Sequence, residues 1–492
     1  MRAKITIDKN NIIDKIDRRI YGSFIEHLGR AVYEGIYDPE HKDADEMGFR
    51  KDVIDLVKAL NVPIVRYPGG NFVSGYNWED GIGDKSKRPR KLDLAWLSLE
   101  TNQVGIDEFQ EWASRVGSEI MMAVNLGTRG PDEARSLIEY CNGKTDTYYA
   151  NLRRQNGFEK PFDIKLWCLG NEMDGDWQIC HKTAEEYGRV ATETAKVLKW
   201  VDSSIELVAC GSSDPNMPTF GEWERVVLNH TYDYVDYLSM HCYYGNKAQN
   251  TADFLARAED MDRFIKTTAK ICDEIKEKKN SNKTINLSFD EWNVWYRTKD
   301  EEKTIEKWQI APALLEEKYN FEDALLVGCM LITLQNNCDR VKIACLAQLI
   351  NVIAPIMTEK NGGAWKQTIF YPYMLSSLYG NGATLNTEVE VGSYKSKEGW
   401  DIPYLYTSTI YNEEKDEIVV FAVNRNLNED ISLEINGFDG YKLDKHLELY
   451  SDNLNETNDK DNERVKLTNR TIDDKSPINL KKHSWNMLTF KR

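Results

Sequence analysis

The sequence predicts an α/β protein in which a (β/α)8 TIM barrel is joined to a second, smaller all-β sandwich of the jelly-roll type. Between residues 15 and 350, short apolar or β-branched runs alternate with longer amphipathic stretches, whereas after about residue 370 the runs become short, alternating and separated by polar turns. The chain of 492 residues also exceeds the size that one hydrophobic core supports. We expect a barrel over residues 16–370 and a sandwich built from residues 1–15 and 371–492.

The barrel prediction depends on a count of buried strands. Nearly continuous apolar strands that alternate with helices are typical of parallel strands covered on both faces. An open doubly wound sheet is the structural alternative, but it requires a glycine-rich phosphate turn after its first strand, and IYGSFIEH is not such a turn. The eight strand candidates are RIYGSF (19–24), PIVRYP (63–68), EIMMAVNL (119–126), IKLWCLG (164–170), IELVACG (205–211), YVDYLSMH (234–241), TINLSFDEW (284–292) and RVKIACLA (340–347).

Helices are expected between these strands, where apolar residues recur at three- and four-residue steps and charged residues occupy the opposite face. The clearest are GFRKDVIDLVKALN (48–61), GIDEFQEWASRVG (105–117), TAEEYGRVATETAKVLKWV (183–201) and FLARAEDMDRFIKTTAKICDEIKEKK (254–279). In the second part of the chain, runs such as PYLYTSTIYN, EIVVFAVNR and HSWNMLTF predict antiparallel strands. The opening segment KITIDKNNIIDKID resembles these short strand-like runs, so both ends of the chain should contribute to the sandwich.

Composition restricts the kinds of partner and compartment. The formal charge of −17 argues against nucleic acid and against an anionic membrane, because both need a basic surface. Nine cysteines are an odd number without metal-type spacing, which suits a reducing compartment. The N-terminus lacks a long apolar segment, and no run reaches the roughly 18 apolar residues of a membrane span. We expect a cytoplasmic protein that needs no metal or organic cofactor.

Polar residues follow the predicted strands, and in a TIM barrel the active site lies at the carboxyl ends of the strands. These side chains should therefore converge on one pocket. They are Glu26 and His27 after the first strand, Arg66 in the second and Asn71 after it, Asn171 and Glu172 after the fourth, His241 and Tyr243 at the sixth, Asp290 and Glu291 at the seventh, and Gln348 after the eighth.

Glu172 and Glu291 form the pair that suggests a chemistry. A single glutamate after a strand is usually a helix N-terminal charge or a salt-bridge partner. Two carboxyl groups on opposed sides of a barrel mouth are what glycosidic cleavage requires, since one protonates the leaving oxygen and the other meets the developing oxocarbenium ion. Such groups can approach to the roughly 5–5.5 Å of a retaining glycosidase. For His27 and His241 we favour a structural role, in which each histidine fixes a carboxylate, over proton transfer.

The motifs around these residues resemble glycoside hydrolase family 51, the retaining α-L-arabinofuranosidases whose catalytic glutamates follow the fourth and seventh barrel strands. The resemblance spans about residues 20–370 in the family's order, and the terminal sandwich also matches. The motifs are GSFIEHLGR, VRYPGGNFVSGYNWEDGIG, AVNLGTRG, WCLGNEMDG, HCYYGN, SFDEWNVWY and LAQLINVIAPI.

The resemblance implies a role for each matching residue. Glu172 would be the general acid/base and Glu291 the nucleophile. Arg66 would orient the residues around the sugar and pair with a glutamate near the nucleophile, and His241 would line the same wall. The residues implied to bind substrate are Glu26, Asn71, Asn171, Tyr243 (which would also hold the nucleophile), Gln348, Trp96 and Trp295.

The expected activity is therefore exo-acting release of terminal, non-reducing α-L-arabinofuranosyl residues through a covalent glycosyl-enzyme. Short arabino-oligosaccharides or arabinoxylo-oligosaccharides are the expected substrates, and the resemblance implies a homo-oligomer, commonly a hexamer. Two alternatives stay open at this point: an endo-acting β-glucanase or xylanase on the same barrel, and a non-catalytic sugar-binding protein. Linkage preference among α-1,2, α-1,3 and α-1,5 bonds is not readable from the motifs.

Overall fold

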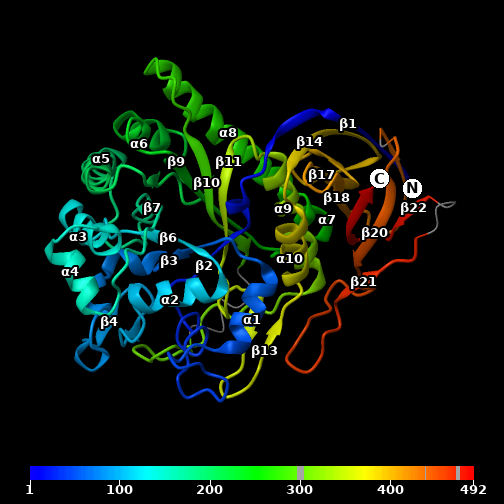
Figure 1. Ribbon diagram of the computed structural model, residues 1–492. Coiled ribbons are helices and arrows are strands. Elements are labelled where there is room, and N and C mark those ends of the chain that lie inside the picture. Colours follow the sequence, from blue (N-terminus) through cyan, green and yellow to red (C-terminus); the bar gives the residue numbers. More distant parts are fainter. Residues whose placement is uncertain (296–303, 438, 473–476) are drawn as a thin grey trace.

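A computed structural model describes residues 1–295, 304–437, 439–472 and 477–492. Two large sheets organise the chain, a closed barrel and a nine-stranded sheet beside it (Figure 1). In the described parts of the chain, no helix combines the length and the apolar character needed to cross a bilayer.

The closed barrel contains all eight predicted strands, each paired in parallel with its neighbours, so the predicted barrel is confirmed. The observed bounds differ from the predicted runs by up to three residues. In the first run, residues 19–21 belong to a 3-10 turn (Arg18–Tyr21), because the Asp17 side chain accepts from Arg19 N and the Arg19 side chain turns to Glu206. The strands are β2 (Gly22–Phe24), β3 (Ile64–Tyr67), β6 (Glu119–Ala123), β7 (Leu166–Leu169), β8 (Glu206–Ala209), β9 (Tyr237–Tyr244), β10 (Asn286–Val294) and β11 (Val341–Ala347).

Helices surround the barrel. The predicted segment 254–279 is divided at Ala256 into two helices. The segment that follows Thr183 is one helix, and a capping box between Thr183 and Glu186 caps its N-terminus. The helices are α1 (Lys51–Leu60), α2 (Ile106–Val116), α3 (Pro131–Asn142), α4 (Tyr148–Gln155), α5 (Ala184–Val201), α6 (Glu222–Thr231), α7 (Thr251–Leu255), α8 (Arg257–Lys278), α9 (Phe321–Asn336) and α10 (Phe370–Tyr379).

Helix α9 joins the two parts of the molecule. It packs on α8 and α10 on one side and on strands of the second sheet on the other, which explains why it is apolar all round. Gly328 permits the close approach, because a Cβ there would lie 2.3 Å from the ring of Trp485. Helix α10 packs on α1 and α9, although residues 371–379 fall within the range predicted for the sandwich; the proposed division of the chain stays a prediction.

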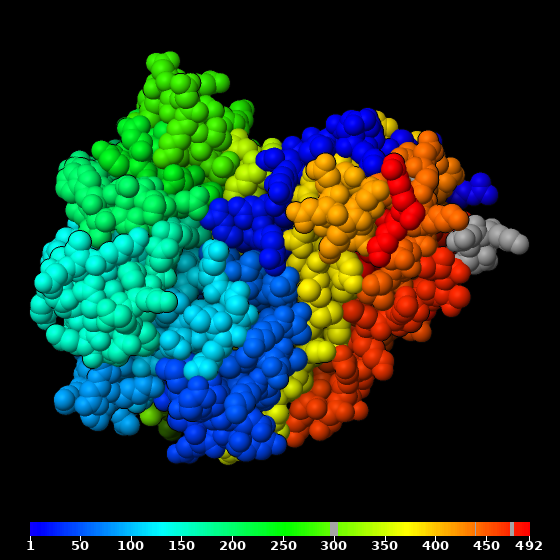
Figure 2. Space-filling model, in the orientation of Figure 1, coloured from blue at the N-terminus to red at the C-terminus, as the bar shows by residue number. Residues whose placement is uncertain are grey.

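The nine-stranded sheet forms the β-sandwich and takes strands from both chain ends, as Figure 2 also shows by the N-terminal residues (blue) lying against the C-terminal ones (orange and red). Strand β1 pairs antiparallel with β14 and parallel with β19. The order is β21 (Leu467–Asn469), β20 (Lys442–Leu449), β23 (Ser484–Lys491), β18 (Glu417–Asn424), β17 (Leu405–Asn412), β14 (Ala383–Glu390), β1 (Arg2–Lys15), β19 (Ile431–Asn436) and β22 (Ile478–Leu480). Separate two-stranded pairs are β4 (Lys91–Asp93) with β5 (Ser98–Glu100), β12 (Ile356–Thr358) with β13 (Ala364–Lys366), and β15 (Ser393–Lys395) with β16 (Asp401–Pro403).

Candidate active site

A cavity of about 650 Å³ opens at the carboxyl ends of the barrel strands. The side chains predicted from the sequence gather here. Those that line the cavity are Glu26, Asn71, Trp96, Glu172, Tyr243, Glu291, Trp295 and Gln348. The other predicted site residues, Arg66, Asn171 and His241, are buried, and their side chains reach the carboxylates of the cavity or each other.

Glu172 and Glu291 face each other across this cavity. Glu172 lies just beyond the end of β7, after Gly170 has turned the chain through a positive φ of 91°, and Glu291 lies within β10. One oxygen from each carboxyl group and Nδ1 of His241 all lie within 4.8 Å of one another. This separation matches a retaining pair, since inverting enzymes keep their carboxyl groups roughly 6.5–9.5 Å apart to admit a water.

Both oxygens of Glu291 are held by donors. Arg66 Nη1 donates to Oε1 at 2.6 Å and the Tyr243 hydroxyl donates to Oε2 at 2.7 Å. Arg66 also donates through Nη2 to Asn171 Oδ1 at 2.7 Å, so one guanidinium orients both Glu291 and the residue that precedes Glu172. Burial, together with the charge of Glu291, holds the pKa of Tyr243 well above its usual range, and its hydroxyl therefore remains a donor. A carboxylate fixed in this way is suited to in-line attack.

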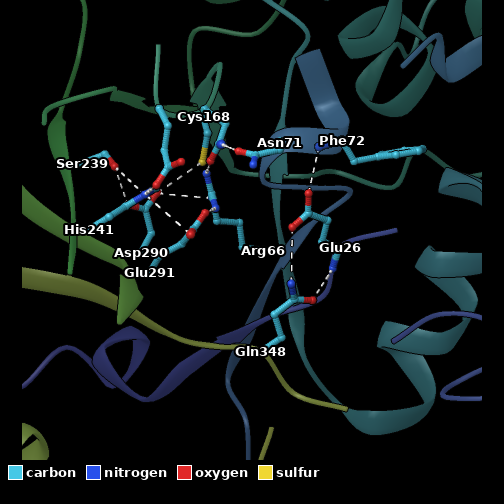
Figure 3. A network of polar contacts seen from close by, with 12 residues as sticks. Glu26, Arg66, Asn71, Phe72, Cys168, Ser239, His241, Asp290, Glu291 and Gln348 are labelled. Carbon is cyan, nitrogen blue, oxygen red and sulfur yellow. Dashed lines mark hydrogen bonds and ion pairs between the residues drawn. The ribbon is translucent and has the colours of Figure 1, made fainter. Parts of the chain in front are cut away.

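His241 connects Glu172 to the buried Asp290. Figure 3 shows His241 beside Asp290 and Ser239. The Nδ1 of His241 donates to Glu172 Oε1 at 2.9 Å, and its Nε2 lies 3.3 Å from Asp290 Oδ1 and 3.2 Å from Ser239 Oγ. Burial alone lowers the pKa of His241, but the carboxylates of Glu291, Asp290 and Glu172 outweigh it and raise the pKa to about 10. The ring is thus an imidazolium with two donors, in line with the predicted carboxylate-fixing role.

Replacing His241 with asparagine keeps a donor near the position of Nδ1 but removes the charge. A histidine whose pKa is raised on folding stabilises the fold fully below its ordinary value of 6.5, and this stabilisation is lost as the pH rises through about 10. We expect His241→Asn to lower the free energy of unfolding by about 3 kcal/mol at pH 6. The difference from wild type should shrink steadily toward pH 10, measured by urea unfolding.

His446 provides the matched control, because burial lowers its pKa and its Nε2 lies 2.9 Å from the neutral amide oxygen of Asn486. His446→Asn should therefore give a difference that is flat between pH 7 and pH 10. A His241→Asn difference that is equally flat over this range would mean that His241 is neutral in the folded protein.

Glu26 forms the centre of the opposite wall, next to Gln348 in Figure 3. Its Oε1 accepts from Phe72 N at 2.8 Å and from Trp96 Nε1 at 2.9 Å, and its Oε2 accepts from Gln348 Nε2 at 3.3 Å. Burial raises the pKa of this carboxyl group to about 8, against the two donors on Oε1, which lower it. A Cβ at Gly70 would lie 2.2 Å from Oε2, so glycine is required there.

His27 has the structural role favoured from the sequence. Its Nδ1 lies 2.9 Å from Glu100 Oε2 and its Nε2 lies 2.8 Å from the Tyr67 hydroxyl, while its ring stacks on Phe72 at 4.7 Å between centroids. Glu100 ends the β4–β5 hairpin that carries Trp96. His27 therefore ties this hairpin to the strand ends that hold Glu26 and Asn71, and it does not line the cavity.

Sequence reasoning missed several residues of the site. Ser239 donates to Asp290 Oδ1 at 2.6 Å, and strand periodicity could have found it, since residues 239 and 241 share one face. Trp177 donates through Nε1 to Glu172 Oε2 at 2.7 Å. In the sequence, the only signal for Trp177 as a site residue was its position in the loop after Glu172. A segment that follows β8 also lines the cavity, through Ser213, Asp214, Asn216 and Met217.

Glu172, His241 and Glu291 are also the group, among the described residues, whose donor atoms lie close enough together to hold a metal ion. Within the group each of these side chains already has a hydrogen-bond or ion-pair partner, and Arg66 and Tyr243 donate to Glu291. Two carboxyl groups joined by a charged imidazole are arranged for proton transfer and nucleophilic attack on one bound group.

Comparison with known proteins places this arrangement in a family. The model described as Alpha-L-arabinofuranosidase 1 domain matches residues 56–264, and the model described as Alpha-L-arabinofuranosidase C-terminal domain matches residues 290–484. The chain is 57% identical to an intracellular exo-α-(1→5)-L-arabinofuranosidase of Halalkalibacterium halodurans, over 99% of each chain. It is 54% identical to a Bacillus subtilis protein described as intracellular exo-α-(1→5)-L-arabinofuranosidase 1, over 100% of this chain and 99% of the relative. A solved family 51 α-L-arabinofuranosidase from Bifidobacterium longum superposes with a TM-score of 0.95 at 43% identity, covering 99% of both chains.

Proposed function

Because the chain belongs to the α-L-arabinofuranosidases of glycoside hydrolase family 51, we propose that it is an exo-acting enzyme that releases terminal, non-reducing α-L-arabinofuranosyl residues with retention of configuration. The observation that carries the proposal is the approach of Glu172 and Glu291 to within 4.8 Å at the mouth of the barrel. This proximity supports the assignment of one glutamate as the acid and the other as the nucleophile.

In the first step, Glu291 attacks the anomeric carbon of the bound arabinofuranosyl unit while Glu172, in its acid form, gives its proton to the leaving oxygen. The bond between the anomeric carbon and that oxygen breaks as the bond to Glu291 forms, so the leaving sugar departs as a neutral alcohol. Arg66 and Tyr243 hold Glu291 in line for this attack. Glu26, Asn71, Asn171 and Gln348 supply hydrogen-bonding groups for the hydroxyls of the sugar.

In the second step, Glu172 as carboxylate takes a proton from a water that attacks the anomeric carbon, and Glu291 is released. Two inversions at the same carbon give net retention. Trp96 and Trp295 also line the cavity in which this reaction takes place. The residue roles are part of the proposal, and they are supported by the hydrogen bonds described above.

We propose arabino-oligosaccharides or arabinoxylo-oligosaccharides as the substrates, with α-1,5 links preferred, since the H. halodurans and B. subtilis relatives are described as exo-α-(1→5) enzymes. The same two relatives are described as intracellular, which supports a cytoplasmic location. We also propose, from family resemblance alone, that the protein forms a homo-oligomer and that this oligomer is a hexamer.

The test uses 4-nitrophenyl α-L-arabinofuranoside beside the corresponding β-D-xyloside and β-D-glucoside, followed by arabino-oligosaccharides with α-1,2, α-1,3 and α-1,5 links. We expect turnover of the arabinofuranoside at least about tenfold above the other two, because discrimination in a hydrogen-bonded pocket is strong. The oligosaccharides should yield arabinose alone. A ladder of longer products would show endo action, and a β-configured first product by proton NMR would exclude retention.

A further inference from the structure

The loop that follows β7 brings a tryptophan onto the general acid/base. Trp177 lies five positions after Glu172, and its indole Nε1 donates to Glu172 Oε2 at 2.7 Å. The ring lines the cavity and is 49% exposed, although a tryptophan on a protein surface normally buries more of its apolar area. The hydrogen bond to a carboxylate is the polar contact that this ring makes in the described structure.

Both oxygens of Glu172 therefore have a donor. His241 Nδ1 occupies Oε1 at 2.9 Å from a ring that is only 2% exposed, and Trp177 Nε1 occupies Oε2 from the open side. A carboxylate has about four lone-pair positions, so a position on Oε2 remains for the proton that the acid form gives to the glycosidic oxygen, or for a water that donates to the carboxylate. The two donors fix the plane of the carboxyl group without blocking its chemistry.

The local sequence favours this position of the indole. A Cβ at Gly175 would lie 2.4 Å from Cε2 and Cζ2 of Trp177, so the ring folds back over the turn only because residue 175 has no side chain. The turn itself is closed by Gly175 N donating to Glu172 O at 2.9 Å. Gln178 continues the attachment, since its Oε1 lies 3.4 Å from Asn171 Nδ2.

We propose that Trp177 is a positioning residue for the acid/base: its indole N–H, opposite His241, orients the Glu172 carboxyl group and stabilises the charge that appears on it when the proton leaves. The inference rests on the proposed function and deepens it. A hydrogen bond to an ionised group is roughly twice as strong as one between neutral groups, so the contact tightens as Glu172 becomes a carboxylate. It therefore assists proton donation more than it assists sugar binding.

The consequence depends on the leaving group. A sugar leaving group departs only when its oxygen is protonated, whereas 4-nitrophenoxide departs without protonation. Loss of the indole N–H should thus slow cleavage of α-1,5-arabinobiose more than cleavage of 4-nitrophenyl α-L-arabinofuranoside. A ring that only contacted the arabinofuranosyl unit, or only held the loop together, would affect both substrates by the same factor, because both carry the same arabinofuranosyl unit.

Two variants remove the contact in different ways. Trp177→Phe keeps a flat ring and removes the N–H, whereas Gly175→Ala keeps the indole and pushes it away from Glu172; the backbone of Gly175 is outside the positive-φ region, so alanine fits it. For both variants we expect the loss in kcat/KM on arabinobiose to exceed the loss on the aryl substrate by about tenfold, the size of one hydrogen bond to a charged group. The control is Trp308→Phe. Trp308 is an exposed tryptophan whose backbone N donates to Leu97 O, and its replacement should leave the ratio of kcat/KM between the two substrates unchanged.

A double-mutant cycle completes the test. In a Glu172→Ala background, with the aryl substrate and azide as the external nucleophile, adding Trp177→Phe should change turnover by less than about twofold, since its hydrogen-bond partner is gone. Equal losses on both substrates in the single variants, or an undiminished loss in the double variant, would overturn the positioning role. Wild-type protein that cleaves neither arabinofuranoside would instead overturn the proposed function.

Discussion

Replacing Glu291 with alanine should abolish hydrolysis of every α-L-arabinofuranoside, whatever its leaving group. The glycosyl-enzyme cannot form without this carboxylate, and no described side chain beside it offers a second nucleophile in the same position: Tyr243 and Arg66 are donors to Glu291, and Asp290 is turned toward His241 and Ser239. We expect kcat to fall by roughly 10⁴-fold or more, as for other enzymes that lose their nucleophile. Initial rates on 4-nitrophenyl α-L-arabinofuranoside measure the effect.

Glu291→Gln is the matched control for folding in this experiment. The amide fills the same volume and its oxygen still accepts from Arg66 or Tyr243, whereas alanine leaves the buried Arg66 with fewer partners. Both variants should be inactive, while the melting temperature of the glutamine variant should stay closer to that of wild type. Activity within tenfold of wild type in either variant would remove Glu291 from the nucleophile role.

Replacing Glu172 with alanine should have an effect that depends on the substrate. For α-1,5-arabinobiose we expect kcat/KM to fall by about 10³-fold, because the leaving sugar then departs unprotonated. For 4-nitrophenyl α-L-arabinofuranoside the fall in kcat/KM should be much smaller, since the first step needs little acid. Its kcat should still drop, because water is no longer deprotonated in the second step.

Azide separates these two steps. It needs no general base, so it should restore turnover of the aryl substrate by Glu172→Ala and yield α-L-arabinofuranosyl azide, the product of two inversions. Glu291→Ala should not respond to azide in this way. Equal losses on both substrate types in Glu172→Ala, or a β-configured azide, would break the assignment of acid and nucleophile.

The barrel was predictable because its strands are buried on both faces. Burial on both faces leaves an apolar run in the sequence, and eight such runs separated by amphipathic segments have few other solutions. Where the prediction was wrong, a local contact was responsible: residues 18–21 turn as a 3-10 segment because Asp17 caps Arg19 N. Helix α9, apolar all round, shows no amphipathic period because it is covered by the barrel on one side and the sandwich on the other.

The predicted site residues follow from position at the strand ends, but their partners do not. Adjacent residues of a regular strand point to opposite faces, yet Asp290 reaches His241 while Glu291 reaches Arg66 and Tyr243. The pairing of β10 with β9 shifts register between Ser288 and Glu291, and this irregularity lets both acids serve the site. No local pattern in SFDEWN indicates such a shift.

The fold class could be predicted from the sequence, and so could the presence of polar residues at the strand ends, including the two glutamates, because buried strands and the residues that follow them form local patterns. Which donor holds which oxygen could be seen only in the folded chain: Arg66 holds Glu291, His241 holds Glu172, and His27 holds Glu100 outside the cavity. The physical reason is distance. A hydrogen bond across the barrel depends on the closure of eight strands, which is not encoded within a few residues of the side chains that it joins. The contact of Trp177 with Glu172 differs, because Gly175 lies between the two residues and leaves room for the ring.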